Sequence, residues 1–130
     1  MNGLDYGSMR LWQRKLQQSE RTVDQFIQKF LLEQALEALA KAKANTPSED
    51  PGLREAWTLS SVQKVRGGWQ VTLTNSAAGA SALEYGHMDS SRTTWSEGRF
   101  ICTLAVSETA ERLPQHFQAA FAAWKGEMGL

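Results

Sequence analysis

The side chains with the best potential for nucleophilic catalysis in this chain are Cys102, His87 and Glu84. A thiol, an imidazole and a carboxylate can act together when the base reaches the nucleophile and the third group orients the base. However, Cys102 stands between Ile101 and Leu104 at the start of a predicted helix, where a small buried thiol is ordinary. A structural role is therefore favoured for Cys102, and an enzyme ranks third among the hypotheses.

Metal and phosphate sites have little support in the sequence. A structural zinc site normally uses four Cys or His ligands, whereas this chain has one cysteine and two histidines, His87 and His116. His116 lies in a helical pattern and is expected at the surface. The pair Gly67-Gly68 lacks the Gly-Lys-Ser/Thr ending of a phosphate-binding loop and joins two strands. We expect no metal and no cofactor.

Length and composition indicate a single small domain. With 130 residues the chain can build one hydrophobic core. Its 14 basic residues balance 14 acidic ones, which disfavours DNA binding through a broad basic face. The single cysteine fits a reducing compartment. No signal peptide is visible, and the most apolar stretch, residues 26–44, contains too many polar residues to span a membrane. A soluble, cytoplasmic protein is expected.

A long helix is predicted before residue 45. Leu11, Trp12 and Leu16 indicate first helical turns, and Thr22 with Gln25 resembles a capping box at which the helix begins or restarts. Asn45-Thr46-Pro47 should end the helix, because the residue before a proline is pushed out of the helical region. The apolar residues that follow helical spacing are Val23, Phe26, Ile27, Phe30, Leu31, Ala35 and Ala38.

A β-hairpin is predicted after the helix, with Gly67-Gly68 as its two-residue turn. Its first strand contains Trp57, Leu59 and Val65. In its second strand, apolar residues alternate with Gln70, Thr72 and Thr74. The apolar set of Trp69, Val71 and Leu73 should face Phe26, Ile27 and Phe30 of the helix. A short third strand is expected at Leu83–Tyr85.

Residues 87–98 or so are polar and aperiodic, which predicts a mobile loop. Glu84-Tyr85-Gly86 should form its root, with Tyr85 packed, Glu84 facing solvent and Gly86 at a positive φ. Five tryptophans are many for one small core, and Trp95 inside the loop is the first candidate for a subunit contact. Deletion of residues 89–94 should leave the melting temperature nearly unchanged and block assembly.

The fold class that follows is α+β, in one domain over residues 1–130. A long N-terminal helix should pack on a small antiparallel sheet, made of the hairpin plus the short third strand. A C-terminal helical segment should begin at Ile101 and be kinked or restarted at Pro114.

Short motifs stand in a recognisable order along most of the chain. After the long helix come Thr46, Pro47, Glu49 or Asp50, Gly52, Leu53, Arg54 and Trp57. After the hairpin come Asn75, Ala80, Glu84, Tyr85, Gly86 and His87, and then Trp95, Gly98, Arg99 and Phe100. This order and spacing resembles the minor tail component or tail-completion family of tailed DNA bacteriophages and prophages. Residues 48–52, 78–79 and 82 depart from the pattern of that family.

The resemblance implies a structural virion assembly protein of the phage neck or tail, which completes the tail or joins it to the head. It implies ring-type association without catalysis, with copies of the same chain and with connector and tail proteins as partners. The implied location is the virion tail or neck, with the host cytoplasm during assembly. No membrane or small-molecule substrate is implied, and direct contact with DNA is not expected. The expected partner interface is Glu84, Tyr85, Gly86, His87, Arg92, Trp95, Gly98, Arg99 and Phe100.

The second hypothesis is a small nucleic-acid-binding or toxin-like module encoded by a mobile element. Neutral net charge and the lack of a recognition-helix or RNA-binding motif speak against it. The basic residues that could gather into a patch are Lys41, Lys43, Arg54, Lys64, Arg66, Arg92 and Arg99.

Overall fold

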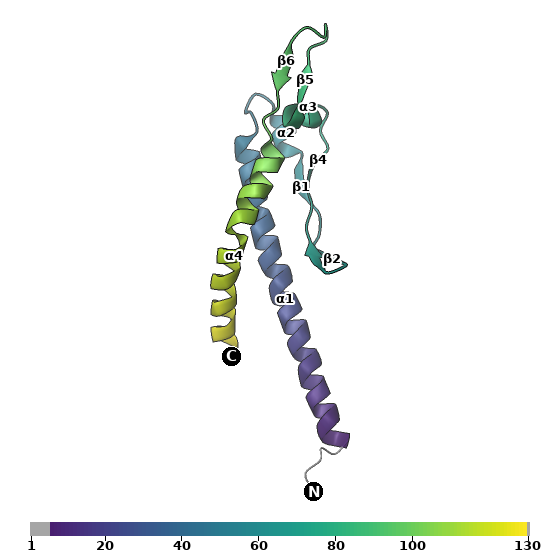
Figure 1. Ribbon diagram of the computed structural model, residues 1–130, viewed down its shortest axis with the longest axis vertical. Coiled ribbons are helices and arrows are strands. Elements are labelled where there is room, and N and C mark those ends of the chain that lie inside the picture. The colour runs from purple at the N-terminus through teal and green to yellow at the C-terminus, as the bar shows by residue number, and fades with distance from the viewer. Residues whose placement is uncertain (1–5, 130) are drawn as a thin grey trace.

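Two long antiparallel helices form the spine of the molecule in the computed structural model, which describes residues 6–129 (Figure 1). They are α1 (Tyr6–Asn45) and α4 (Ile101–Met128). Between them come α2 (Pro51–Glu55), α3 (Ala80–Tyr85) and six strands: β1 (Trp57–Leu59), β2 (Gln63–Val65), β3 (Gly68–Gln70), β4 (Leu73–Asn75), β5 (Gly86–Met88) and β6 (Trp95–Glu97). The predicted α+β class is confirmed. Across residues 6–129, no helix combines the length and apolarity that a membrane crossing requires.

The first helix is longer than expected. It runs unbroken through Thr22, so the expectation that it begins or restarts there was wrong. The Thr22 hydroxyl donates to the carbonyl of Gln18, one turn earlier, at 2.9 Å, and therefore does not cap a helix start. Strong helix formers on both sides of Thr22 explain the continuity. The predicted end at Asn45 is confirmed. The side chains of Leu11, Trp12 and Leu16 lie outside the described part of the chain.

The predicted hairpin is present, with a bulge near its middle. β1 pairs with β4 and β2 with β3, both antiparallel. The register shifts by one residue between the two ladders, because three residues, 60–62, oppose two, 71–72. The Ser60 hydroxyl bridges the shift by accepting from the amide of Thr72 at 2.8 Å. The turn itself is Arg66-Gly67, with Gly67 at φ +87°, because Gly68 already pairs with Val65. The predicted Gly-Gly turn was thus one residue too late.

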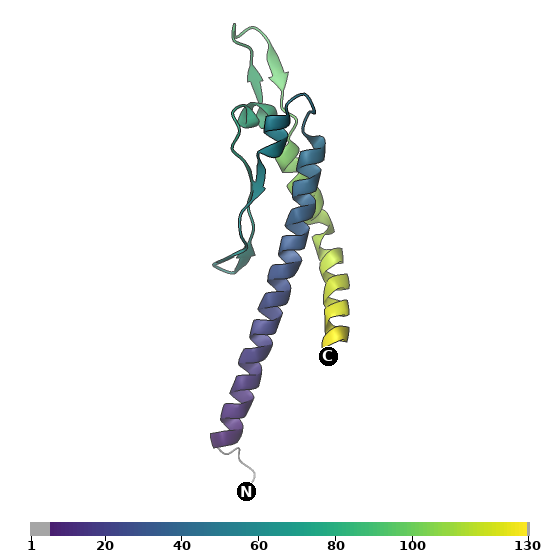
Figure 2. The same cartoon turned by 180° about the vertical axis from the view of Figure 1, so that it is seen from behind.

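The expected third strand at Leu83–Tyr85 was wrong, since these residues belong to α3. Ala, Leu and Glu in this stretch favour a helix, and Gly79 and Gly86, both at positive φ, bound it on either side. A strand does begin at the next residue, but β5 pairs with β6 in a second hairpin and joins no other strand in the described chain. Figure 2 shows this second hairpin projecting beyond the end of the helical spine.

The aromatic residues of α1 pack against α4. The expectation that they pack against the sheet was therefore wrong. Phe26 lies 5.1 Å from Trp124 and 5.9 Å from both Phe117 and Phe121, measured between ring centroids. Phe30 is 6 % exposed and contacts Phe117 at 5.4 Å. The buried part of the sheet lies further along α1, where Ala42, Trp57, Ile101 and Ala105 form the core with Leu73 packed against it. An apolar stripe on a helix can be covered by a sheet or by another helix, and here the second helix covers its middle section.

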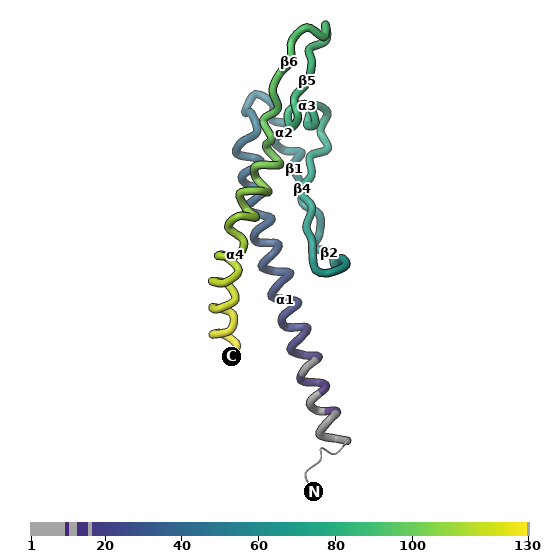
Figure 3. The backbone as a smooth tube through the Cα atoms, viewed as in Figure 1, coloured from purple at the N-terminus to yellow at the C-terminus, as the bar shows by residue number. Residues whose placement is uncertain are grey.

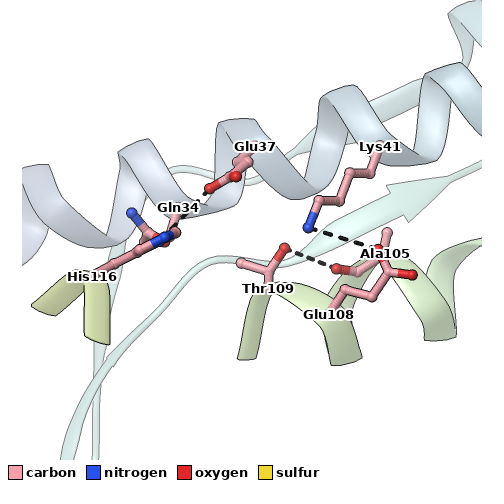
Figure 4. A network of polar contacts seen from close by, with 7 residues as sticks. All are labelled: Gln34, Glu37, Lys41, Ala105, Glu108, Thr109 and His116. Atoms are coloured by element: carbon pink, nitrogen blue, oxygen red, sulfur yellow. Dashed lines mark hydrogen bonds and ion pairs between the residues drawn. The ribbon is translucent and has the colours of Figure 1, made fainter. Parts of the chain in front are cut away.

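Polar contacts fix the two long helices in register (Figure 4). The ring nitrogen Nδ1 of His116 lies 2.8 Å from the side-chain oxygen of buried Gln34, and 4.0 Å from a carboxylate oxygen of Glu37. Lys41 and Glu108 form an ion pair at 3.7 Å. His116 is therefore part of the α1–α4 interface and not the plain surface residue that its sequence context suggested. α4 continues through Pro114 as one helix, and its axis bends about half-way along (Figure 1).

Replacement of Phe30 by Ala should lower the free energy of unfolding by about 3–5 kcal/mol, because it removes a buried ring from the α1–α4 interface. Urea denaturation followed by circular dichroism measures the change. The matched control is Leu36→Ala on the same helix, where the side chain is about half exposed. Equal losses in the two variants would contradict the described helix packing.

Candidate functional site

The motif at the end of α1 builds the corner that carries the first hairpin. Thr46 is buried, and its hydroxyl donates to the carbonyl of Ala42 and accepts from the indole N–H of Trp57, both at 2.7 Å. The guanidinium of Arg54 donates to the carbonyl of Thr46 at 2.9 Å. These hydrogen bonds tie the end of α1 to the start of β1. Thr46, Arg54 and Trp57 are therefore architectural residues.

Between Thr46 and Trp57 lies α2, where sequence analysis expected only a turn. Its N-cap is Asp50, whose carboxylate accepts from the amide of Leu53 at 3.0 Å, and Pro51 follows at the first helical position. An acidic cap followed by proline is a recognised helix start that could have revealed this element. The side chain of Asn75 donates to the carbonyl of Leu53 at 2.7 Å and so ties α2 to β4.

The root of the second hairpin is organised by one carboxylate. Glu84 is only 8 % exposed, so the expectation that it faces solvent was wrong. Its two oxygens accept from the amides of Cys102 and Thr103 at 2.8 and 2.9 Å, and from the Thr103 hydroxyl at 2.7 Å. Burial raises the pKa of Glu84, but the hydrogen bonds from Thr103 and Cys102 outweigh it, so the net pKa lies below 4.5. The ionised carboxylate thus caps the positive end of the α4 dipole.

Two glycines allow the two ends of the second hairpin to lie against each other. Figure 3 shows the chain leaving and returning beside α3. A Cβ on Gly98 would collide with the carbonyl oxygen of Glu84 and lie 2.6 Å from the carbonyl carbon of Tyr85. Gly86 has φ +93°, as predicted, and a Cβ there would lie 2.6 Å from the ring of Trp95. The amide of Arg99 also donates to the carbonyl of Leu83 at 2.8 Å, and the amide of Phe100 donates to the backbone carbonyl of Glu84 at 3.1 Å.

These contacts distinguish two parts of the molecule, the arm and the arm root. The arm is the β5–β6 hairpin, residues 86–97. The arm root is Glu84, Gly86, Gly98 and Thr103, the residues that fix the arm to α3 and α4.

The tip of the arm is a hydrogen-bonded turn. The amide of Asp89 donates to the carbonyl of Thr94 at 2.9 Å. The carboxylate of Asp89 accepts from the Thr93 amide at 2.9 Å, and from the hydroxyls of Ser91 and Thr93 at 3.0 Å. The backbone hydrogen bond from Thr93 is the main reason why the pKa of Asp89 falls to about 2. The aperiodic polar sequence therefore encodes a specific turn, while the predicted mobility of residues 87–98 stays a prediction.

Four large apolar side chains are exposed on the arm and its root. Tyr85 is 65 % exposed, Trp95 51 %, Met88 45 % and Phe100 44 %. Tyr85 was expected to pack; it touches the edge of Phe100 with ring centroids 6.5 Å apart but remains open to solvent. Met88 pairs with Trp95, so both lie on one face of the hairpin. Tyr85 with Phe100, and Met88 with Trp95, thus form two pairs of exposed apolar side chains. Exposed apolar surface of this kind marks interaction sites.

The predicted interface residues thus divide into two groups. Glu84, Gly86 and Gly98 belong to the arm root, where they set geometry. The remaining members are exposed: Tyr85, His87, Arg92, Trp95, Arg99 and Phe100. Sequence reasoning missed Met88, although its two-residue spacing from Gly86 puts it on the face of the arm that Trp95 covers. It also missed Thr103, a residue in the first turn of α4 whose hydroxyl donates to the carboxylate of Glu84.

The arrangement around Cys102 opposes nucleophilic chemistry. Burial and the nearby charge of Glu84 raise the pKa of the Cys102 thiol, which is the reverse of the activation that a catalytic cysteine needs. The carboxylate of Glu84 is occupied by three hydrogen bonds, and His87 lies out on the exposed arm. Within residues 6–129, no cluster of three or more His, Cys, Asp or Glu has a geometry suited to a metal ion.

The basic residues do not gather into one patch. Lys41 pairs with Glu108, and Arg54 is tied to the Thr46 carbonyl. Lys64 lies over the ring of Trp69, 5.6 Å from its centroid, near the turn of the first hairpin. That turn and the tip of the arm point in opposite directions in Figures 1 and 2. The basic charges are therefore spread along the molecule.

Replacement of Gly98 by Ala should lower the free energy of unfolding by about 1–3 kcal/mol, because the new methyl group meets backbone atoms that cannot move aside. Thermal and urea unfolding measure the loss. Gly126→Ala is the matched control, since nothing lies within 4 Å of a Cβ there and the residue is inside α4. This control should be neutral or stabilising by up to about 1 kcal/mol. Equal behaviour of the two variants would mean that the crossing at the arm root is not tight.

The turn at the arm tip should depend on pH in the acid range only. Because the folded pKa of Asp89 is about 2 and the usual value is 3.8, the turn is fully stabilised above about pH 4 and loses this contribution as the pH falls towards 2. An NMR titration of the Thr93 amide should show a midpoint near 2, absent in Asp89→Asn. A midpoint near 4 would show that the carboxylate is free of the turn.

Comparison with known families supports the order of motifs described above. Residues 12–86, more than half of the chain, match the model of the family described as "Bacteriophage HK97-gp10, putative tail-component". Searches of curated proteins and of solved structures returned no match. The matched stretch includes the Thr46 corner and the α3 side of the arm root, and it confirms the resemblance seen in the sequence. The chain therefore belongs to the HK97 gp10-like family of bacteriophage tail components, structural parts of the virion tail.

Proposed function

We propose that the protein acts at the neck of the virion, where it completes the tail or joins it to the head by ring-type association without catalysis. Membership of a tail-component family supports a structural role. The observation that carries the proposal further is the arm, an exposed apolar hairpin on a tightly built root.

The arm has the properties of a docking element. Aromatic side chains supply most of the binding energy in protein interfaces when they enter a pocket of the partner. Tyr85 and Trp95 are the most exposed of the large apolar residues around the arm. The root holds their backbone in place before binding, which reduces the conformational entropy that docking must overcome.

The direction of the arm favours a contact between different surfaces on neighbouring subunits. The arm extends beyond the end of the helical spine, away from the body of its own chain (Figures 1 and 2). A contact between an arm and a different surface on the next subunit is heterologous, and such contacts close into a ring when the rotation permits. The proposed partners are other copies of this chain together with connector and tail proteins.

The chemistry of the candidate residues supports a role without catalysis or direct DNA contact. The Cys102 thiol is held protonated by its surroundings. The basic residues are dispersed, and the 14 positive charges are balanced by 14 negative ones. Salt-sensitive, tight DNA binding by the isolated monomer in a filter-binding titration would overturn this proposal and favour a nucleic-acid-binding module.

The double replacement Tyr85→Ser and Trp95→Ser should abolish head–tail joining and change the melting temperature by only a few degrees, because both side chains are more than half exposed. The readouts are complementation of particles that lack this protein and native mass spectrometry with the purified tail and connector proteins. The matched control is Ser96→Ala, at the neighbouring position on the opposite face of the same hairpin, which should leave joining normal. Normal joining by the Tyr85/Trp95 variant would show that the arm is not the docking element.

A further inference from the structure

An apolar groove, the spine groove, lies where α1, the first hairpin and α4 meet. Apolar side chains of all three elements line it, among them Leu31 of α1, Val71 of the first hairpin and Val106 of α4. Val106 is 47 % exposed, so the groove opens to solvent. Within the described residues no aromatic side chain lines this groove, although aromatic rings fill the contact between α1 and α4 further along.

The spine groove has room for one aromatic side chain. Its volume is about 160 Å³, and an apolar cavity of roughly 150 Å³ in another protein accepts benzene. Small residues help to keep the groove open, since Ala35 and Ala110 both line it and Ala110 is exposed. A ring that enters from outside therefore buries apolar surface on both partners, which favours docking.

A buried hydroxyl in the groove can still accept a hydrogen bond. Thr109 lines the groove and is 7 % exposed. Its hydroxyl donates to the carbonyl of Ala105 at 2.8 Å and accepts no hydrogen bond from the described part of the chain. Thr46 makes the same backbone contact on α1 and in addition accepts from the indole N–H of Trp57. An indole beside Thr109 would complete the arrangement that Thr46 already has.

The arm carries an indole of this kind. Of the tryptophans whose side chains the structure describes, Trp95 alone is more than half exposed. It cannot reach the spine groove of its own chain. Thr109 lies about 12 Å along α4 from the first residue of that helix, whereas the arm extends from the same end in the opposite direction (Figures 1 and 2). A second copy must therefore supply the groove.

The charges of the two surfaces are complementary. From β1 to β4, the first hairpin carries two basic residues, Lys64 and Arg66, and no acidic residue, so its formal net charge is +2. The arm carries Asp89 and Glu97 against Arg92, which gives a formal net charge of −1 with histidine neutral. Opposite charge on the two surfaces speeds their encounter and favours one orientation.

We propose that the arm of one copy docks on the spine groove of the next, with the indole of Trp95 in the groove beside Thr109. The inference rests on the proposed function, and it identifies the partner of the arm as a second copy of this chain. The contact joins two different surfaces and is heterologous, so it can repeat from copy to copy.

A variant that fills the groove tests the docking directly. Ala110→Phe should place a ring of the same chain in the groove and raise the dissociation constant for self-association of the full chain at least about tenfold in sedimentation equilibrium. The matched control is Ala122→Phe, the same change at an exposed position of α4 outside the groove, which should leave the constant within about twofold. Circular dichroism checks that both variants keep their helix content. Equal dissociation constants for the two variants would overturn the groove as the docking surface.

A pair of substitutions tests the position of the indole. Thr109→Val keeps the shape of the side chain and removes the hydroxyl, so it should raise the dissociation constant about threefold to tenfold. In a Trp95→Phe background the same change should have no effect, because phenylalanine has no N–H to donate. An equal effect in both backgrounds, or none in either, would overturn the placement of the indole beside Thr109.

Two readouts separate this inference from the proposed function. Self-association reports the contact between copies, and complementation of particles reports head–tail joining. If Tyr85→Ser with Trp95→Ser blocks joining but Ala110→Phe leaves self-association unchanged, the groove inference is wrong and the arm docks on a connector or tail protein. If Trp95→Ser and Ala110→Phe both weaken self-association while joining stays normal, the inference stands and the proposed function fails. A chain that stays monomeric at every concentration overturns the inference.

Discussion

The carboxylate of Glu84 is the interaction on which the upper part of this structure depends. It lies at the end of α3, accepts hydrogen bonds from the first turn of α4, and so joins two helices that are separated by the whole arm. A buried carboxylate is costly unless its oxygens are satisfied. Here two amides and one hydroxyl satisfy them, and the dipole of a 28-residue helix adds to their effect. These hydrogen bonds hold the chain beside α3 where it returns from the arm.

The glycines next to this carboxylate follow from the same constraint. When the two ends of the arm are drawn together, backbone passes so close to backbone that Gly98 has no room for a side chain. Gly86 must also adopt a positive φ under the ring of Trp95. The result is a narrow hairpin with a stiff base. A stiff base and an exposed apolar surface rarely occur together by chance, since large apolar side chains are normally drawn into a core.

The α1–α4 pair forms the long axis of the molecule and separates the arm from the N-terminal end of α1. The aromatic ladder of Phe26, Phe30, Phe117, Phe121 and Trp124 holds the middle section. The arm extends from one end of this spine, and the N-terminal part of α1 forms the other end (Figure 1). In the proposed ring, each subunit contacts neighbours around the tail axis and proteins above or below it.

Sequence alone determined the elements whose signals are local. The end of α1 at Asn45 follows from the proline at 47, the alternation from Trp69 to Thr74 follows from the two-residue period of a strand, and the positive φ of Gly86 follows from its lack of a side chain. The order of the same motifs was enough to place the chain in a family of phage tail components. Each of these signals lies within a few neighbouring residues, and the family resemblance adds only the order in which they follow one another.

Tertiary structure decided which surfaces meet. A helical stripe such as Phe26 and Phe30 is equally suited to a sheet or to a helix, and only the folded chain shows that α4 covers it. Glu84 carries no local mark of burial, since its partners lie 18 and 19 residues further on. The polar run after Met88 looked like a loop without structure because its order comes from one side chain, Asp89, that closes a turn between two strands. Local patterns report what a residue can do, whereas burial and partners are properties of the whole fold.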